Sequence, residues 1–284
     1  MAVPVRRRQP VDTENVEALE LDLLLEAIFR LHGYDFRDYA RTSMRRRIAN
    51  IMRQEEAQTI SALQDKVLHD RGCWERLLNG ISVNVSAMFR DPAFFLAFRR
   101  NAVPLLRTYP FIRIWQAGCS LGEEAYSLAI LLEEEGLYDR TLIYATDINE
   151  ITLRQARDAI YPAELMQRYT QNYLHSGGQR SFSEYYTARY EFAILRPSLQ
   201  RNIVFSQHNL VSDAPFNEFN VILCRNVMIY FNRTLQERTH QLFHDSLGMF
   251  GILGLGSRES MRFMPQENLY EPLVHGEKLY RRIA

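Results

Sequence analysis

Hydrophobic positions recur at helical spacing through the first quarter of the chain. Over residues 16–31, apolar side chains return every three or four positions, which is the pattern of an amphipathic helix. Shorter stretches of the same kind predict helices over about 39–53, 60–68 and 74–78. We therefore expect residues 1–80 to form a small all-helical module.

From Phe111 onward, short apolar runs alternate with helical segments. Such alternation favours a mostly parallel, doubly wound sheet with helices between its strands. The expected strands are 111–116, 141–146, 202–206, 219–224, 251–255 and 278–283, and the expected helices are 123–135, 151–160, 165–174 and 234–250. The predicted fold class is α/β, a Rossmann-like sheet that follows an all-α module.

The stretch 182–196 interrupts this alternation. It is rich in tyrosine, phenylalanine and aliphatic residues, which favour strands. We expect a small antiparallel β-hairpin subdomain over about 180–197, inserted at the edge of the sheet. The connection between Tyr190 and Phe192 is short, so this subdomain is expected to fall short of a full three-stranded edge.

A polar, partly extended stretch joins the two patterns. Asp91 followed by Pro92 predicts a helix start, with aspartate as the N-cap and proline in the first turn. We expect a linker over 81–92 that contributes to a site, followed by a domain over 93–284. Arg90 in this linker is either a packing bridge or part of the lip of a site.

The overall balance of charge argues against a polyanionic partner. The chain has 34 basic and 34 acidic residues and a net charge of zero, so nucleic acid is not expected to bind. Its three cysteines are widely spaced and form no metal-ligand pattern, which fits a reducing cytoplasm and predicts no metal. A signal peptide and an apolar stretch of ~20 residues are both missing, so we expect a cytoplasmic protein without membrane insertion.

Basic residues are nevertheless concentrated in one place. The stretch from Arg37 to Arg53 contains six arginines and a single acid, Asp38. A solvated charged helix face is the ordinary interpretation, but so dense a cluster also favours docking on an acidic partner. The residues expected to bind that partner are Arg45, Arg46, Arg47 and Arg53.

A glycine-bearing loop, 118–122, separates the first strand of the sheet from the next helix. Glycines at a helix start let backbone N–H groups approach a ligand, and this loop lies at the carboxyl end of a strand. The acids Glu123 and Glu124 favour a ligand with hydroxyls or a cation over a phosphate. An ordinary strand-to-helix connection is the alternative. A catalytic thiol at Cys119 is disfavoured because no histidine lies nearby in sequence.

Polar side chains also follow the later strands. Asp147 comes 25 residues after Gly122, where nucleoside-binding sheets place the acid that accepts hydrogen bonds from ribose. Alternatively, Asp147 caps the next helix. The glycine pattern is GxxxG rather than GxGxxG, so a single nucleoside is favoured over a dinucleotide. His208 is a possible general base, but a packed histidine is the preferred interpretation because no paired acid is evident.

Five motifs then carry a resemblance to a known family. They are Asn84-x-Ser86-x-Met88-Phe89-Arg90, the loop 118–127, Thr146-Asp147-Ile148, His208-Asn209-Leu210 and Cys224-Arg225-Asn226-Val227-Met228-Ile229-Tyr230-Phe231. Together they resemble the chemotaxis-receptor protein-glutamate O-methyltransferases, the CheR family. The resemblance extends from the arginine-rich helix to the C-terminus and implies the sheet of a class I methyltransferase.

The resemblance implies S-adenosylmethionine as methyl donor, S-adenosylhomocysteine as product and receptor glutamates as acceptors. The positions that match the family's cofactor-binding residues are Asn84, Ser86, Arg90, Gly118, Glu123, Glu124, Asp147, Asn209, Leu210, Asn226 and Val227. Arg90 and Tyr230 match residues at the methyl-transfer site. Which of the two adjacent glutamates binds the cofactor is left open.

Three positions depart from the family pattern. Ser86, Met88 and Ala125 stand where the family usually has threonine, phenylalanine and proline, and the retained hydroxyl of Ser86 lets us expect activity. The implied partner is the cytoplasmic domain of methyl-accepting chemoreceptors. We expect this protein to act on it as a monomer and without a tethering peptide. Two alternatives stay open: a cofactor-binding adaptor without activity, and a methyltransferase with another substrate.

Overall fold

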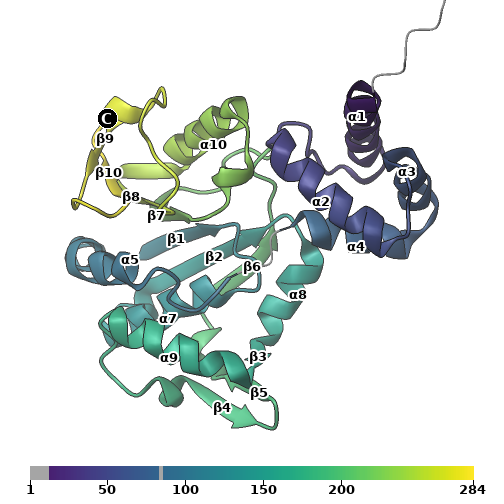
Figure 1. Ribbon diagram of the computed structural model, residues 1–284. Helices are drawn as coiled ribbons and strands as arrows, with labels where there is room; N and C mark the ends of the chain where they lie inside the picture. The colour runs from purple at the N-terminus through teal and green to yellow at the C-terminus, as the bar shows by residue number, and fades with distance from the viewer. Residues whose placement is uncertain (1–12, 83–85) are drawn as a thin grey trace, which may run out of the picture. The chain divides into compact units, whose positions relative to one another are not determined.

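The computed structural model of the chain describes residues 13–82 and 86–284, so the predicted cofactor residue Asn84 lies outside the described residues. The chain divides into two compact units, Met1–Ile81 and Ser82–Ala284 (Figure 1). The first is all-helical and the second is an α/β unit, as the sequence predicts.

The helical unit is built from α1 (Thr13–His32), α2 (Arg41–Gln54), α3 (Ile60–His69) and α4 (Arg71–Ile81). Each helix contributes a buried apolar stripe; the stripes include Leu24, Ile28, Met44, Ile48, Leu63, Val67, Leu77 and Leu78. Thr59 caps α3, since its side chain accepts a hydrogen bond from the backbone N–H of Ala62. The helix predicted over 74–78 is longer in the structure, because Cys73 and Ile81 extend its buried face.

The second unit contains a seven-stranded sheet in the order β6-β2-β1-β7-β8-β10-β9. Its strands are β1 (Ile112–Ala117), β2 (Thr141–Asp147), β6 (Ile203–Gln207), β7 (Phe219–Cys224), β8 (Leu247–Leu255), β9 (Tyr270–Pro272) and β10 (Leu279–Arg282). The first five in the spatial order are parallel, and β10 runs antiparallel between β8 and β9. The prediction of a mostly parallel sheet is confirmed.

Helices cover both faces of this sheet, with α7 on one side and α10 on the other (Figure 1). Their bounds are α5 (Pro92–Ala97), α6 (Val103–Leu106), α7 (Glu123–Glu134), α8 (Glu150–Asp158), α9 (Met166–His175) and α10 (Arg233–Ser246). A π-helix, η1 (Phe98–Ala102), joins α5 to α6. Short 3₁₀ turns are η2 (Tyr138–Arg140), η3 (Ala163–Leu165), η4 (Phe182–Tyr185), η5 (Pro197–Leu199), η6 (Met228–Tyr230) and η7 (Glu267–Leu269).

Two predicted helix ends are wrong. The helix expected over 234–250 ends at Ser246, and the chain continues directly into β8 from Leu247, whose backbone is extended. The helix expected over 151–160 ends at Asp158, because Ala159 adopts a left-handed φ of 54°. Residues 247–250 and Ile160 join strands instead, and Ala159 lies in a turn.

The small sheet has three antiparallel strands in the order β3-β5-β4: β3 (Ile160–Pro162), β5 (Phe192–Leu195) and β4 (Tyr186–Arg189). The hairpin of β4 and β5 is as predicted. The expectation that this subdomain falls short of three strands is wrong, because β3 pairs with β5 through Ile160 and Ile194.

Candidate active site

The glycine loop closes the carboxyl end of β1. Gly118 and Gly122 have left-handed φ values of 74° and 87°, which glycine adopts without strain. The backbone N–H groups of Gly118 and Cys119 both donate to the carbonyl oxygen of Thr146 at 2.8 Å. A Cβ atom on Gly118 would lie 2.4 Å from Cγ2 of Val227. The loops after β1, β2 and β7 are therefore in direct contact.

Asp147, at the end of β2, is held from two sides. Its Oδ2 accepts from the backbone N–H of Ser120 at 2.9 Å, and its Oδ1 accepts from that of Asn149 at 3.0 Å. The cap of α8 is Asn149, whose side chain accepts from the N–H of Ile151. Burial raises the pKa of Asp147, and the hydrogen bonds from Asn149 and Ser120 lower it. The carboxylate thus belongs to the strand-end site and not to the helix cap.

Both acids in the first turn of α7 are buried. Glu123 is 2% exposed; the hydroxyls of Ser86 and Tyr169 hydrogen bond to its carboxylate, and its Oε2 has no hydrogen-bond partner among the described residues. Glu124 is 6% exposed and accepts from Nη1 of Arg225 at 2.6 Å, while its Oε1 has no partner in the described parts of the chain. Burial raises the pKa of both carboxyls. Each acid thus keeps one oxygen available for a ligand.

Arg225 is a central residue of this region that the sequence analysis missed. Its side chain is 1% exposed, and its guanidinium lies 4.1 Å from the ring centroid of Phe94. Besides binding Glu124, its Nη2 donates to the carbonyl of Arg90 at 3.0 Å and to Oδ2 of Asp91 at 2.9 Å. The available signal was its position directly after β7, at the same sheet edge as the predicted residues.

The prediction that the side chain of Asp91 caps the following helix is wrong. Asp91 precedes α5 but does not cap it, because its φ is 56° and its side chain makes no capping hydrogen bond. Its carboxylate is used instead to hold the linker against β7.

The linker is fixed along its described part. The backbone N–H of Phe89 donates to Oγ of Ser127 at 2.8 Å, and Nδ2 of Asn172 donates to the carbonyl of Met88 at 3.0 Å. The Phe89 ring is fully buried, with its centroid 5.3 Å from that of Tyr173. Arg90 follows directly, half-buried, and its charge acts on Glu124. The structure therefore places the charge of Arg90 near Glu124 of α7.

The loop after β6 carries Asn209 and Leu210. Oδ1 of Asn209 accepts from the backbone N–H of Val211 at 2.9 Å, and Leu210 is buried. His208 is also buried, its ring centroid 5.1 Å from that of Trp115, and burial lowers its pKa. This position is that of a packed histidine, whose Nε2 lies 3.5 Å from the carbonyl oxygen of Ala214.

The loop after β7 carries Asn226, Val227 and Tyr230. Asn226 has a left-handed φ of 62°, and Tyr230 ends η6 with a half-buried side chain. Cys119, in the glycine loop, is buried, and burial raises the pKa of its thiol well above the ordinary value. A catalytic thiolate is thus unfavourable here. Groups of three or more metal-ligating side chains are absent from the part of the chain that the structure describes.

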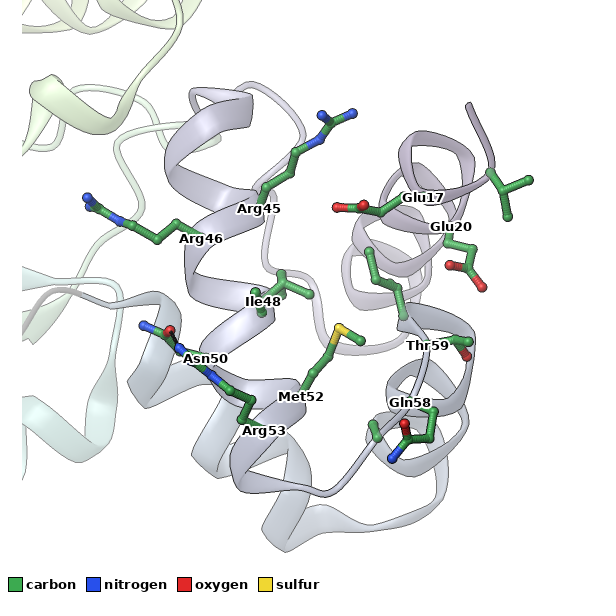
Figure 2. Close-up of a pocket in the computed structure, with 14 residues that line it drawn as sticks. Glu17, Glu20, Arg45, Arg46, Ile48, Asn50, Met52, Arg53, Gln58 and Thr59 are labelled. Atoms are coloured by element: carbon green, nitrogen blue, oxygen red, sulfur yellow. Dashed lines mark hydrogen bonds between the residues drawn. The ribbon is translucent and has the colours of Figure 1, made fainter. Parts of the chain in front are cut away.

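The helical unit contains the predicted partner-binding arginines. Arg45, Arg46 and Arg53, the α2 arginine surface, line a groove of about 810 Å³ with an apolar floor that includes Ile48 and Met52. Figure 2 shows Arg45 of α2 and Glu17 of α1 on opposite walls, while Arg46 points away from α1.

Arg47 does not belong to the α2 arginine surface. It is buried, and its guanidinium donates to the carbonyl of Ile81 within the helical unit. The prediction that Arg47 lies on an exposed partner-binding face is therefore wrong, because one turn of helix carries both a solvent face and a core face.

The residues around the glycine loop fit S-adenosylmethionine. The oxygens Glu123 Oε2, Glu124 Oε1 and Ser120 Oγ are buried and lack a partner among the described residues. Unpaired buried acceptors are costly unless a ligand supplies donors. An α-ammonium group and ribose hydroxyls are such donors, and the sulfonium charge suits an acidic pocket better than a phosphate would.

Comparison with known proteins identifies the chain. The family model described as "CheR methyltransferase, SAM binding domain" matches residues 84–274, and the one described as "CheR methyltransferase, all-alpha domain" matches residues 19–82. The chain belongs to the CheR methyltransferase family. It is accordingly an S-adenosylmethionine-dependent methyltransferase.

Individual relatives agree with this assignment. The chain is 50% identical over 264 residues to "Putative methyltransferase Cher3" of Pseudomonas putida, covering 93% of this chain and 97% of that protein. It is 31% identical to the "Chemotaxis protein methyltransferase" of Escherichia coli over 66% of this chain and 65% of that protein. Among solved structures, a TehB-like SAM-dependent methyltransferase from Corynebacterium glutamicum is 14% identical with a TM-score of 0.37, over 76% of this chain and 96% of that one.

None of the helices within residues 13–82 and 86–284 has the length and apolar character needed to cross a membrane.

Proposed function

We propose that this CheR family methyltransferase transfers a methyl group from S-adenosylmethionine to glutamate side chains of chemoreceptors, in the cytoplasm and as a monomer. The observation that carries the proposal is the charge of Arg90 acting on Glu124, one of two buried acids that each have an oxygen without a partner among the described residues. Relatives named "Chemotaxis protein methyltransferase" support the choice of chemoreceptors as acceptors.

The cofactor has a separate group for each of its polar parts. Asp147 would accept hydrogen bonds from the ribose hydroxyls, as acids at this strand end do in nucleoside-binding sheets. Glu123 would accept from the ammonium group, because the charge of Glu124 is already compensated by Arg225 at 2.6 Å. Ser86 supports Glu123 through its hydroxyl. The positions proposed around the adenosine and methionine parts are Gly118, Asn209, Leu210, Asn226 and Val227, together with Asn84.

The reaction itself requires little proton transfer. A glutamate side chain with an ordinary pKa of ~4.3 is ionised at neutral pH, so it attacks without a base. The bound cofactor supplies an electrophilic sulfonium methyl. This chain's contribution would be to hold the acceptor oxygen in line with that methyl. Arg90 is the cation proposed to bind the acceptor carboxylate, and Tyr230 is proposed to orient it. The buried His208 and the protonated Cys119 are not needed.

The helical unit is proposed to recognise the acceptor protein. The α2 arginine surface presents positive charge, and the adjoining groove has an apolar floor. An acidic, amphipathic receptor helix offers both complementary features. Binding of this kind weakens as salt rises, because exposed charges are screened.

We also propose that the enzyme acts without a tethering peptide. A peptide that adds to a sheet edge binds through main-chain hydrogen bonds, and the edge strand β4 spans only four residues. The β4–β5 connection is two residues, Tyr190 and Glu191, which keeps that edge short.

The test uses methyl-labelled S-adenosylmethionine and purified cytoplasmic fragments of chemoreceptors, each with and without its C-terminal peptide. We expect base-labile label on both forms at rates within about twofold, since glutamyl methyl esters hydrolyse in base. Arg90→Ala should keep S-adenosylhomocysteine binding within about threefold and lose on the order of 100-fold in turnover, as expected when one charged transition-state contact is removed.

Three outcomes would contradict parts of this proposal. Cofactor binding without label on any receptor fragment would support an adaptor. Label only on a small molecule or another protein would identify a different acceptor. Label confined to fragments that keep the peptide would remove tether independence alone.

A further inference from the structure

One buried carboxylate joins the ends of β7 and β8. Glu259, in the loop after β8, is 5% exposed. Its Oε1 accepts from the backbone N–H groups of Val227 at 2.9 Å and Met228 at 2.8 Å. Its Oε2 accepts from those of Asn226 at 3.0 Å and Gly256 at 2.6 Å. Four backbone donors thus converge on a single side chain.

The geometry of this contact suits a carboxylate, because all four of its partners are backbone N–H donors. Burial raises the pKa of Glu259, and the four backbone hydrogen bonds lower it. Hydrogen bonds from N–H groups to an ionised carboxylate are shorter and stronger than neutral ones. Replacing one oxygen would leave two buried N–H groups without an acceptor.

The segment held by Glu259 is under geometric constraint. Asn226 has a φ of 62°, a left-handed backbone conformation that asparagine adopts more readily than most residues with a side chain. A Cβ on Gly256 would lie 2.7 Å from the backbone nitrogen of Asn226, so the backbone segments at these two residues are in contact. On the other side, Val227 packs against the backbone of Gly118.

We propose that Glu259 is a positioning residue for the cofactor: it fixes Asn226 and Val227 against the glycine loop before the cofactor binds. This inference rests on the proposed roles of Asn226 and Val227 in cofactor binding. In this proposal Glu259 makes no contact with the ligand. It acts only through the backbone of the segment 226–228.

The experiment measures S-adenosylhomocysteine binding by calorimetry for Glu259→Gln and a matched control, Glu134→Gln. Glu134 is also fully buried and accepts from Tyr185 and Arg99, but it contacts no predicted site residue. Both variants should lower the unfolding temperature. Glu259→Gln should bind at least about tenfold more weakly, because two N–H groups lose their acceptor, whereas Glu134→Gln should stay within about twofold.

Two further measurements make the result decisive. Gly256→Ala places a methyl group 2.7 Å from both the backbone nitrogen of Asn226 and Oε2 of Glu259, so it should disturb the same contact and also weaken binding. In the wild-type protein without ligand, the amides of Val227 and Met228 should exchange with solvent far more slowly than those of exposed loops. Rapid exchange, or binding by Glu259→Gln within twofold of wild type, overturns the inference. If Asn226→Ala also binds normally, the proposed cofactor roles fail as well; if it binds poorly, only the role of Glu259 fails.

Discussion

The charged side chains proposed for recognition in the helical unit and for chemistry in the α/β unit differ in their exposure. In the helical unit, Arg46 and Arg53 of the α2 arginine surface are exposed. In the α/β unit, Glu123, Glu124 and Glu259 are buried and each is held by specific hydrogen bonds. Exposed charge acts over a distance and is screened by salt, whereas buried charge acts through contact and responds to pH. The proposed recognition and the proposed chemistry thus use charge differently.

The largest expected effect comes from the buried side of this comparison. Asp147→Ala should weaken S-adenosylhomocysteine binding by on the order of 100-fold or more, because the charge-assisted hydrogen bonds proposed between Asp147 and ribose would be lost. Calorimetry at constant salt measures this. Asp139→Ala is the control, since its side chain is 85% exposed. Equal binding by both variants would show that the half-buried carboxylate of Asp147 has no role in cofactor binding.

The next effect tests the exposed charges. Reversing Arg46 and Arg53 to glutamate should raise the KM for a receptor fragment about tenfold at low salt, with cofactor affinity unchanged. The difference should shrink towards 1 M salt, where the screening length is about 3 Å. The control is the same double reversal at Arg30 and Arg71, two exposed arginines on other helices of the unit. A similar KM change in both double variants would mean that net charge alone matters.

The smallest effect concerns stability. Burial raises the pKa of Glu123, so the folded protein keeps this proton to a higher pH than the unfolded chain does. The contribution of this proton to the free energy of unfolding is therefore complete below the ordinary pKa of a glutamate. It is lost as the pH rises through the raised pKa that Glu123 has in the folded protein. Glu123→Gln avoids this loss, and it should melt about 2–4 °C higher at pH 8, with little difference near pH 4.5.

Differential scanning calorimetry of unliganded protein at the two pH values checks this. Glu191→Gln, an exposed site in the same unit, should melt like wild type at both. Cofactor affinity of Glu123→Gln should fall even as its stability rises. A variant that is less stable at pH 8 would show that Glu123 supports the fold and not the ligand.

Long periodic segments were predictable and short ones were not. The five parallel strands follow from apolar runs between polar segments, and α1 to α3 follow from helical spacing. The three-residue strands β3 and β9 carry no periodic signal, and they exist because partners lie beside them. Arg47 shows the same limit within a helix, since its burial depends on the carbonyl of Ile81.

The candidate site likewise contains residues that local sequence pattern could predict and residues that it could not. Gly118, Glu123 and Asp147 stand beside recognisable strand ends, so local pattern was enough to find them. Arg225 and Glu259 were missed because their partners are distant: Arg225 binds Glu124 across 101 positions, and Glu259 binds Asn226 across 33. A side chain whose partners are distant in the sequence produces no recognisable pattern among its sequence neighbours.

The sequence by itself determined the order of helices and strands, the glycine loop and the acids that follow β1 and β2, because these depend on local spacing and residue type. Only the tertiary structure decided which acids are buried, which arginine joins the linker to β7, and which carboxylate holds the segment 226–228. Those outcomes depend on desolvation and on contacts between residues far apart in the chain, and the folded packing alone creates both.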